Sequence, residues 1–276
     1  MSRSIRLITG IPRSGTTLCC KLLNQREDVL ALHEPIEPTS LPQNISASHA
    51  AEKIIAQINL LDRAIELGLP FSHGDKGGLN ISNPVGEDVK EGVRQVVAKR
   101  GVVQLPAREK NSYELIIKQN ALFTALMPML ASQFEMICIV RNPVDVLLSW
   151  LTVDLPVNRG HIPAGERFDA GLKDSLQGEA CLSRQVIIYQ WFMSRFLSSS
   201  LPCIRYEDIV SSDGAVLDQA LGWEVIRRDA LSGQIREFDN DTLVTLKKAI
   251  PLLLALDCGD LYIQEDIKSA LQIQGL

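Results

Sequence analysis

The sequence of 276 residues predicts a three-layer α/β/α domain around a central, mostly parallel sheet of about five strands. Short apolar runs, typical of strands that are buried on both faces, alternate with helical patterns along most of the chain. The first run ends in a glycine-containing loop that leads into a helical pattern. Apolar residues make up 46% of the chain, enough for a large core, so we expect a single domain over residues 1–276.

Five apolar segments are the strand candidates. They are Ile5 to Thr9, Val29 to Leu32, Leu115 to Lys118, Met136 to Val140 and Cys203 to Arg205. Helical patterns separate most of them, and such alternation is typical of a parallel sheet covered on both faces. The first helical pattern runs from Thr16 to Asn24, and a long amphipathic helix is predicted from Glu179 to Ser199.

Residues 36–110 differ in character and are interpreted as a largely helical insertion. We expect helices at Ala50 to Leu67 and near Asp88 to Lys99, separated by a stretch rich in Gly, Asn, Ser and Pro from Ser72 to Gly86. A second irregular stretch runs from Asp154 to Gly178. Loops of this length in compact domains are usually functional, so we expect both segments to border the functional site.

The bulk composition excludes several classes of protein. A net charge of −5 and a pI near 5.5 disfavour duplex nucleic acid as a partner, because phosphate neutralisation favours a basic surface. Neither a signal peptide nor a membrane span is predicted, which favours a cytoplasmic location. The six cysteines form no Cys-x-x-Cys pair and are interpreted as free thiols, so no metal site is expected.

The segment from Gly10 to Thr17 has the spacing of a phosphate loop. It lies between a strand and a helix, so consecutive backbone N–H groups and the helix N-terminus can face an anion. Thr16 takes the place of the lysine that reaches the β- and γ-phosphates in nucleoside triphosphatases, and no strand candidate ends in a Mg²⁺-binding aspartate. Arg13 can supply the missing cation. A P-loop NTPase-like fold is therefore predicted, with a donor that reacts without a bound metal.

Here the sequence resembles the sulfotransferase family that uses 3′-phosphoadenosine 5′-phosphosulfate (PAPS). The phosphosulfate loop of the family has the form Pro-Arg/Lys-Ser-Gly-Thr/Ser-Thr/Ser, which Pro12 to Thr17 match at every position. The similarity continues through Leu22 to Asn24 and Val29 to Pro35, which look like the carbohydrate, tyrosylprotein and bacterial branches. The resemblance implies that the donor is PAPS, released as adenosine 3′,5′-bisphosphate. The residues it implies for the 5′-phosphosulfate are Arg13, Ser14, Gly15, Thr16 and Thr17.

Arg141 and Ser149 form a second candidate anion site. The arginine ends a predicted strand and the serine lies about two turns into the next helix, with Asn142 as a plausible N-cap and Pro143 at the first helical position. This run resembles the 3′-phosphate motif of the family, Arg-Asp/Asn-Pro followed by Ser eight residues after the arginine. The resemblance implies that Arg141 and Ser149 bind the 3′-phosphate. By itself, such a helix start is also common in proteins without this role.

Tyr206 is the candidate for contact with the adenine. It lies in Ile204 to Asp208, which resembles the Arg/Phe-Tyr-Glu-Asp segment of the family, whose tyrosine contacts this base. The alternative is an aromatic side chain that closes the last strand against the core.

Sulfonate transfer needs an in-line nucleophile, charge relief on the leaving phosphate oxygen and a base for the acceptor proton. Arg13 and Lys118 are the candidates for charge stabilisation. Lys118 resembles the strand-end lysine of the cytosolic branch, where Lys-Thr-His carries the basic histidine two residues later, but Asn120 stands at that place here. The base must therefore lie elsewhere in this chain.

Glu34 is the preferred base, because it matches the glutamate that several bacterial, carbohydrate and tyrosylprotein members use. His33 is the alternative, with an ordinary pKa near 6.5. Alternation at a strand end directs adjacent side chains oppositely, so only one of the two is expected to face the site. Glu34 can also be read as a surface carboxylate before Pro35. The other histidines, His49, His73 and His161, are interpreted as surface residues.

The sequence therefore predicts a PAPS-dependent sulfotransferase that acts on a hydroxyl or amine of a small-molecule or glycan-type acceptor. The insertion at 36–110 and the stretch from Asp154 to Gly178 are expected to form the acceptor pocket. The alternatives are a P-loop phosphotransferase, such as a kinase, and a catalytically inactive nucleotide-binding protein. No heptad pattern or self-complementary patch indicates an oligomeric state.

Overall fold

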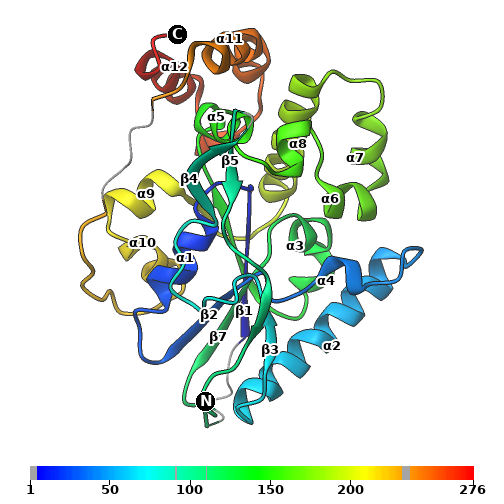
Figure 1. Ribbon diagram of the computed structural model, residues 1–276, viewed down its shortest axis with the longest axis vertical. Coiled ribbons are helices and arrows are strands. Elements are labelled where there is room, and N and C mark those ends of the chain that lie inside the picture. Colours follow the sequence, from blue (N-terminus) through cyan, green and yellow to red (C-terminus); the bar gives the residue numbers. More distant parts are fainter. Residues whose placement is uncertain (1–4, 91, 110, 232–236) are drawn as a thin grey trace.

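A computed structural model describes residues 5–90, 92–109, 111–231 and 237–276. A sheet of five parallel strands, in the order β2-β7-β1-β8-β9, lies at its centre (Figure 1). The strands are β1 (Ile5–Gly10), β2 (Val29–His33), β7 (Glu114–Lys118), β8 (Glu135–Val140) and β9 (Cys203–Arg205). All five predicted strands are confirmed, and the sheet is parallel throughout.

Helices cover both faces of this sheet, which explains why the strands carry apolar residues at consecutive positions. One face packs against α1 (Thr16–Leu23), α9 (Tyr206–Ser211) and α10 (Ala215–Ala220). The other face packs against a larger set: α2 (Ala47–Glu66), α3 (Ala121–Ala125), α4 (Met127–Leu130), α5 (Pro143–Leu151), α8 (Cys181–Leu197), α11 (Asn240–Leu254) and α12 (Gln264–Ile273). Within β1, Leu7 belongs to the larger core and Ile8 to the smaller one. The predicted three-layer fold is thus confirmed.

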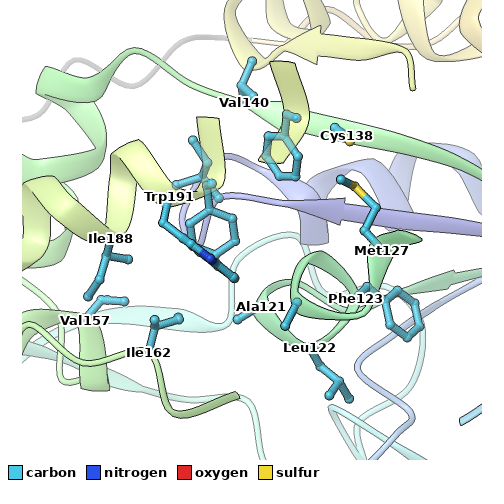
Figure 2. Packing of buried hydrophobic residues seen from close by; sticks show 14 of the residues in the cluster. Ala121, Leu122, Phe123, Met127, Cys138, Val140, Val157, Ile162, Ile188 and Trp191 are labelled. Atoms are coloured by element: carbon cyan, nitrogen blue, oxygen red, sulfur yellow. The ribbon is translucent and has the colours of Figure 1, made fainter. Parts of the chain in front are cut away.

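The larger core continues from the sheet into the helices on its far side. Figure 2 shows part of it, with Cys138 and Val140 of β8 and side chains from α3, α4 and α8. These strand residues are fully buried, as are Phe123 of α3 and Phe192 of α8. The strand ends that carry the candidate site residues are therefore attached to a well-packed layer.

The segment between β2 and β7 contains strands as well as a helix. After η1 (Pro38–Ser40), α2 confirms the helix predicted at Ala50 to Leu67. The helix predicted near Asp88 to Lys99 is wrong, because β4 (Val85–Lys90) and β5 (Val93–Val96) form an antiparallel hairpin there. A second antiparallel pair joins β3 (Phe71–His73) to β6 (Gly101–Val103).

Two features explain why the hairpin forms in place of a helix. Its strands are rich in valine, a β-branched residue that favours extended backbone, and Gly92 adopts a positive φ of 80° between them. The hairpin also bonds to the chain that follows α5. The backbone N–H of Arg94 donates to the carbonyl of Thr152, and the carbonyl of Arg94 accepts from the N–H of Asp154. A tertiary contact therefore stabilises the extended conformation.

The stretch from Asp154 to Gly178 is more regular than expected. It holds η2 (Pro156–Arg159), α6 (Pro163–Phe168) and α7 (Ala170–Ser175), of which α6 packs against α3. The predicted helix from Glu179 to Ser199 is confirmed as α8, and η3 (Gly259–Leu261) precedes α12. Among the described residues, no helix combines the length and apolar character needed to cross a membrane.

Candidate active site

The loop from Ile11 to Gly15 joins β1 to α1 and is held against the neighbouring strand. The N–H of Ile11 and the hydroxyl of Ser14 both donate to the carbonyl of Ile139, at 3.1 and 3.0 Å. The indole N–H of Trp150 donates to the carbonyl of Pro12 at 2.8 Å. These bonds fix the loop, and the first N–H groups of α1 have no partner within their own helix. The loop can thus present N–H groups to an anion.

Ser14 does not share the orientation of its neighbours. Its side chain is fully buried, its hydroxyl is bonded to Ile139, and its backbone N–H donates to the carbonyl of Ile11 at 3.0 Å. The structure therefore brings Gly15, Thr16 and Thr17 to the cavity, whereas the hydroxyl of Ser14 is directed toward β8 and stabilises the loop.

Gly15, Tyr206 and Arg141 form a close stack beside the loop. Gly15 has a φ of 86°, and a Cβ atom added there would lie 2.4 Å from the ring of Tyr206, so only glycine fits. On the same ring, the guanidinium carbon of Arg141 lies 4.5 Å from the centroid, in cation–π contact. Arg141 also donates to Asp145 at 3.3 Å, but its buried Nε has no hydrogen-bond partner among the described residues. The stack therefore includes a cationic donor that still has bonding capacity.

Arg13 reaches across the site to two other segments. Its Nε donates to the hydroxyl of Ser149 at 3.1 Å, and one Nη donates to the side-chain carbonyl of Asn83 at 3.0 Å. An Nη of Arg141 lies 3.5 Å from the carbonyl oxygen of Arg13. Ser149 therefore joins Arg13 to α5, and the two arginines line one cavity. Sequence reasoning missed Asn83, because nothing in its local pattern indicates that it lies beside the loop.

Glu34 and Lys118 form an ion pair at the ends of adjacent strands. Lys118 Nζ donates to Glu34 Oε1 at 2.7 Å, and the backbone N–H of Glu34 donates to the carbonyl of Lys118, also at 2.7 Å. The side chain of Lys118 is only 3% exposed, whereas that of Glu34 is 41% exposed. The nearby ammonium group holds the pKa of the Glu34 carboxyl below its ordinary value. The carboxylate is therefore ionised at neutral pH.

His33 lines the same cavity as Glu34, so the expectation that only one of them faces the site is wrong. Glu34 has a φ of 49° and no longer follows the alternation of β2, which ends at His33. Burial and the neighbouring His73 lower the pKa of His33 to about 4. Its Nε2 is buried and has no hydrogen-bond partner in the described part of the chain. His33 is therefore neutral at physiological pH.

His73 is fully buried, which corrects its interpretation as a surface residue. Its ring meets that of His33 edge to face, with centroids 4.4 Å apart, and its Nε2 accepts from the backbone N–H of His33 at 3.3 Å. Its Nδ1 lies 2.9 Å from the carbonyl of Asp75, an arrangement that assigns the proton to Nδ1. Gly74 donates its N–H to the carbonyl of His33. His73 and Gly74 thus bond to the backbone N–H and the carbonyl of His33, the residue before Glu34.

One cavity of about 1210 Å³ lies at the carboxyl ends of the parallel strands, and all the predicted site residues named above except Ser14 contribute to its lining. The order of the strands gives the cavity two sides. Arg141 and Tyr206 follow β8 and β9 on one side of the loop, whereas Lys118 and Glu34 lie at β7 and β2 on the other. Both the insertion and the stretch from Asp154 to Gly178 contribute lining residues. In the described ranges, no three His, Cys, Asp or Glu side chains gather in a way that would hold a metal ion.

The fold and the site define a three-layer α/β protein whose cavity lies at the loop between its first strand and first helix. The family model of the sulfotransferase domain matches residues 5–214. The chain therefore belongs to the sulfotransferase domain family, which supports sulfonate transfer as its activity and confirms the resemblance seen in the sequence. No curated protein matches the chain. It is also similar to the crystal structure of a sulfotransferase from Alicyclobacillus acidocaldarius, at 16% identity and a TM-score of 0.40, over 99% of this chain and 97% of that one.

Proposed function

We propose that this protein transfers the sulfonate group of PAPS to a hydroxyl or amine acceptor. The observation that carries the proposal is that Arg13 and Arg141 line one cavity, with an Nη of Arg141 3.5 Å from the carbonyl oxygen of Arg13. PAPS carries an anionic group at each end of its ribose, a 5′-phosphosulfate and a 3′-phosphate. Two guanidinium groups along a single cavity complement this distribution of charge.

The donor is proposed to lie along the strand ends. Its phosphosulfate binds Arg13 and the N–H groups of Gly15, Thr16 and Thr17, while the 3′-phosphate binds Arg141 and Ser149. Two features support the second half of this assignment. Arg141 retains an unpaired buried Nε, and Ser149 accepts a hydrogen bond from Arg13, so its own hydroxyl proton is available to the phosphate. The ring of Tyr206, between Gly15 and Arg141, borders the adenine end.

The reaction proposed at this site is an in-line displacement at sulfur. The acceptor oxygen or nitrogen attacks the sulfur atom, the bond from sulfur to the 5′-phosphate oxygen breaks, and its electron pair stays with that oxygen. Arg13 and the loop N–H groups stabilise this charge. The acceptor proton passes to the carboxylate of Glu34, with His33 as the alternative base.

Lys118 has two functions in this proposal. Its pairing with Glu34 lowers the pKa of the carboxyl, and a carboxylate with a lowered pKa is a weaker base. Transfer therefore requires Lys118 to move its contact from Glu34 toward the phosphosulfate. This movement brings a second cation to the leaving group and restores the basicity of Glu34.

Binding measurements separate this function from that of a P-loop kinase. We expect adenosine 3′,5′-bisphosphate to bind tightly in isothermal titration calorimetry, and ATP with Mg²⁺ to bind weakly. Arg141→Ala should raise the dissociation constant of the bisphosphate roughly 10- to 100-fold, as expected for losing charged hydrogen bonds. Binding of AMP, which lacks the 3′-phosphate, should change little. Tight binding of ATP with Mg²⁺ and none of the bisphosphate would favour the kinase.

A transfer assay separates an active enzyme from an inactive nucleotide-binding protein. Labelled sulfonate from PAPS is offered to a panel of alcohols, phenols, sugars, amines and peptides. Incorporation into any acceptor establishes activity, and its loss in Arg13→Ala ties the activity to this cavity. Binding of the bisphosphate without transfer to any member of the panel would support the inactive alternative.

A further inference from the structure

The cavity wall beyond Glu34 and Lys118 has a large apolar part, and we call this whole region the acceptor side. It is lined from the insertion, from the start of α3, and from the stretch between α5 and α7. That last stretch contributes six lining residues, all of them apolar: Leu155, Pro156, Val157, Ile162, Pro163 and Ala164. Ala121 and Leu122 of α3 adjoin them, since α3 packs on α6. Figure 2 shows that Val157, Ile162 and Leu122 belong to one apolar cluster.

The hairpin of β4 and β5 adds further apolar residues to the cavity wall. Val85 and Val96 both line the cavity, and Val96 is 41% exposed. An exposed valine in a cavity wall leaves apolar surface in contact with water, and a bound ligand can cover that surface. None of the lining residues that these segments contribute is Phe, Tyr or Trp. The wall is therefore aliphatic.

Two of the polar side chains on this side, Arg100 and Asn83, are already paired with the protein. Arg100 donates to the hydroxyl of Ser72 and to the carbonyl of Ile36. Asn83 accepts from Arg13 and also from the backbone N–H of Val85. A ligand hydroxyl that is buried against the aliphatic part of the wall, where the lining side chains carry no polar atoms, is unfavourable.

Further polar side chains line the cavity in two places, at the strand ends and on the hairpin side. Gln119 and Asn120 follow Lys118 directly, beside Glu34, and both line the cavity. Ser82 and the exposed Glu87 are further polar lining residues on the hairpin side. The acceptor side thus combines a polar end, next to the proposed base, with an aliphatic wall that carries a few polar groups on the hairpin side. This polarity matches a molecule with a single reactive polar group on an apolar body.

We propose that the acceptor is an apolar alcohol, with an aliphatic or alicyclic body and one reactive hydroxyl, and not a sugar. The inference rests on the proposed function and specifies its second substrate. The hydroxyl oxygen attacks the sulfur of PAPS, adenosine 3′,5′-bisphosphate leaves, and the hydroxyl proton passes to Glu34. The product is an alkyl sulfate ester.

A homologous series of alcohols tests the aliphatic wall directly. Transfer of labelled sulfonate from PAPS is measured with primary alcohols from butanol to octanol, and with glucose and N-acetylglucosamine. We expect kcat/KM to rise about fourfold with each added methylene, which corresponds to about 0.8 kcal/mol per buried CH₂. A flat series, or transfer to the sugars in preference to octanol, overturns the inference.

Substitutions in the aliphatic wall test whether this surface binds the alcohol. Val96→Asn and Leu155→Asn each place an amide in the aliphatic surface. Val96 is exposed and Leu155 is half-buried, so the fold should tolerate both substitutions. Either should raise the Michaelis constant for octanol about tenfold and leave that for PAPS unchanged. Leu60→Asn is the matched control, because Leu60 is 70% exposed on α2 and outside the cavity lining. An unchanged Michaelis constant for octanol in both wall variants contradicts the proposal.

Separate measurements test the donor and the acceptor. If adenosine 3′,5′-bisphosphate does not bind, the donor assignment fails, and the acceptor class fails with it. If the bisphosphate binds and sugars receive the label while octanol does not, only the acceptor class is wrong. Binding of the bisphosphate by calorimetry is therefore measured before the acceptor series.

Discussion

Lys118 of β7 donates a hydrogen bond of 2.7 Å to Glu34, the residue that follows β2. The lysine is almost completely buried, whereas the glutamate keeps contact with the cavity. The two strands are neighbours in register, with Lys118 opposite His33, so the fold itself sets this pairing. Because Lys118 holds the pKa of Glu34 below its ordinary value, any basicity of Glu34 depends on where this ammonium group lies.

Replacing Lys118 should therefore change the pH dependence of the reaction. With Lys118 present, the lowered pKa keeps Glu34 ionised, and activity is lost only as the pH falls through that pKa. In Lys118→Met the cation is gone and burial raises the pKa of Glu34, so the acid limb of kcat/KM should move to higher pH. Turnover should also fall by about 10²-fold, because the second cation that we propose for the leaving group is lost. Initial rates between pH 4 and 8 measure both effects.

The exposed Lys173 on α7 provides the control for this experiment. Lys173→Met removes the same charge from the protein and should leave the acid limb in place. An acid limb at the same pH in Lys118→Met and in the unchanged protein would show that Glu34 is not the titrating group.

The choice between Glu34 and His33 as base can be made by matched amide substitutions. Glu34→Gln should lower kcat by about 10²-fold or more, because it removes the proposed proton acceptor and keeps the shape of the side chain. His33→Gln should have a smaller effect on kcat, since a pKa of about 4 makes this histidine a weak proton acceptor. Titration with adenosine 3′,5′-bisphosphate should give similar affinities for both variants. An active Glu34→Gln together with an inactive His33→Gln would reverse the assignment.

Gly15 should be irreplaceable because of the ring that covers it. Gly15→Ala strains a backbone with a φ of 86° and places a methyl group 2.4 Å from Tyr206, so the ring must move. Left-handed backbone alone costs an L-residue about 1–2 kcal/mol. We expect the affinity for adenosine 3′,5′-bisphosphate to fall about tenfold or more, as measured by calorimetry.

Gly178 separates backbone strain from the displacement of Tyr206. It has a similar φ of 76°, but an added Cβ would meet no atom within 4 Å. Gly178→Ala should therefore lose a similar amount of stability and keep the same affinity for the bisphosphate. Equal losses of affinity in both variants would mean that the contact between Gly15 and Tyr206 has no part in binding.

Asp218 and Arg228 form a buried ion pair that should dominate the stability of the region around α10. Two guanidinium nitrogens of Arg228 donate to the carboxylate at 2.7 and 2.8 Å, and neither side chain is exposed. Arg228→Met leaves Asp218 buried with fewer partners, so the free energy of unfolding should fall by about 3–5 kcal/mol. Reversible urea unfolding, followed by circular dichroism, measures the change.

An exposed ion pair calibrates this measurement. Arg159 and Asp154 lie 3.0 Å apart, with side chains 61% and 46% exposed. Arg159→Met should change the free energy of unfolding by less than about 1 kcal/mol, because water screens the pair. A loss below about 1 kcal/mol in Arg228→Met as well would contradict a stabilising role for the buried pair.

Local patterns predicted much of this protein because they depend only on residues close in the chain. The five strands are apolar at consecutive positions, and the loop after β1 combines Gly15 with a following helical pattern. Arg141 and Asn142 were recognised in the same way, and Asn142 caps α5 as predicted, since its side chain accepts from the N–H of Val144. The i, i+4 spacing of Arg141 and Asp145 also indicates their hydrogen bond, which was not predicted.

The hairpin near Asp88 shows where local patterns fail. Valine and charged residues in this segment fit either an exposed helix or an edge hairpin. Backbone bonds between Arg94 and the chain after α5 favour the extended form, and they join residues about 60 positions apart. No window of sequence around Asp88 contains this information.

The sequence by itself determined the α/β fold, the sulfotransferase family and the positions of Arg13 and Arg141 after strands. This was possible because the patterns of strands, loops and helix starts depend on short segments of the chain. Only the tertiary structure decided which side chains meet: Arg13 with Asn83 and Ser149, His33 with His73, and Lys118 with Glu34. Those contacts join residues that are 40 to 136 positions apart. These contacts depend on the order of the strands in the sheet and on the packing of the insertion against it. Both are set by the free energy of the whole chain.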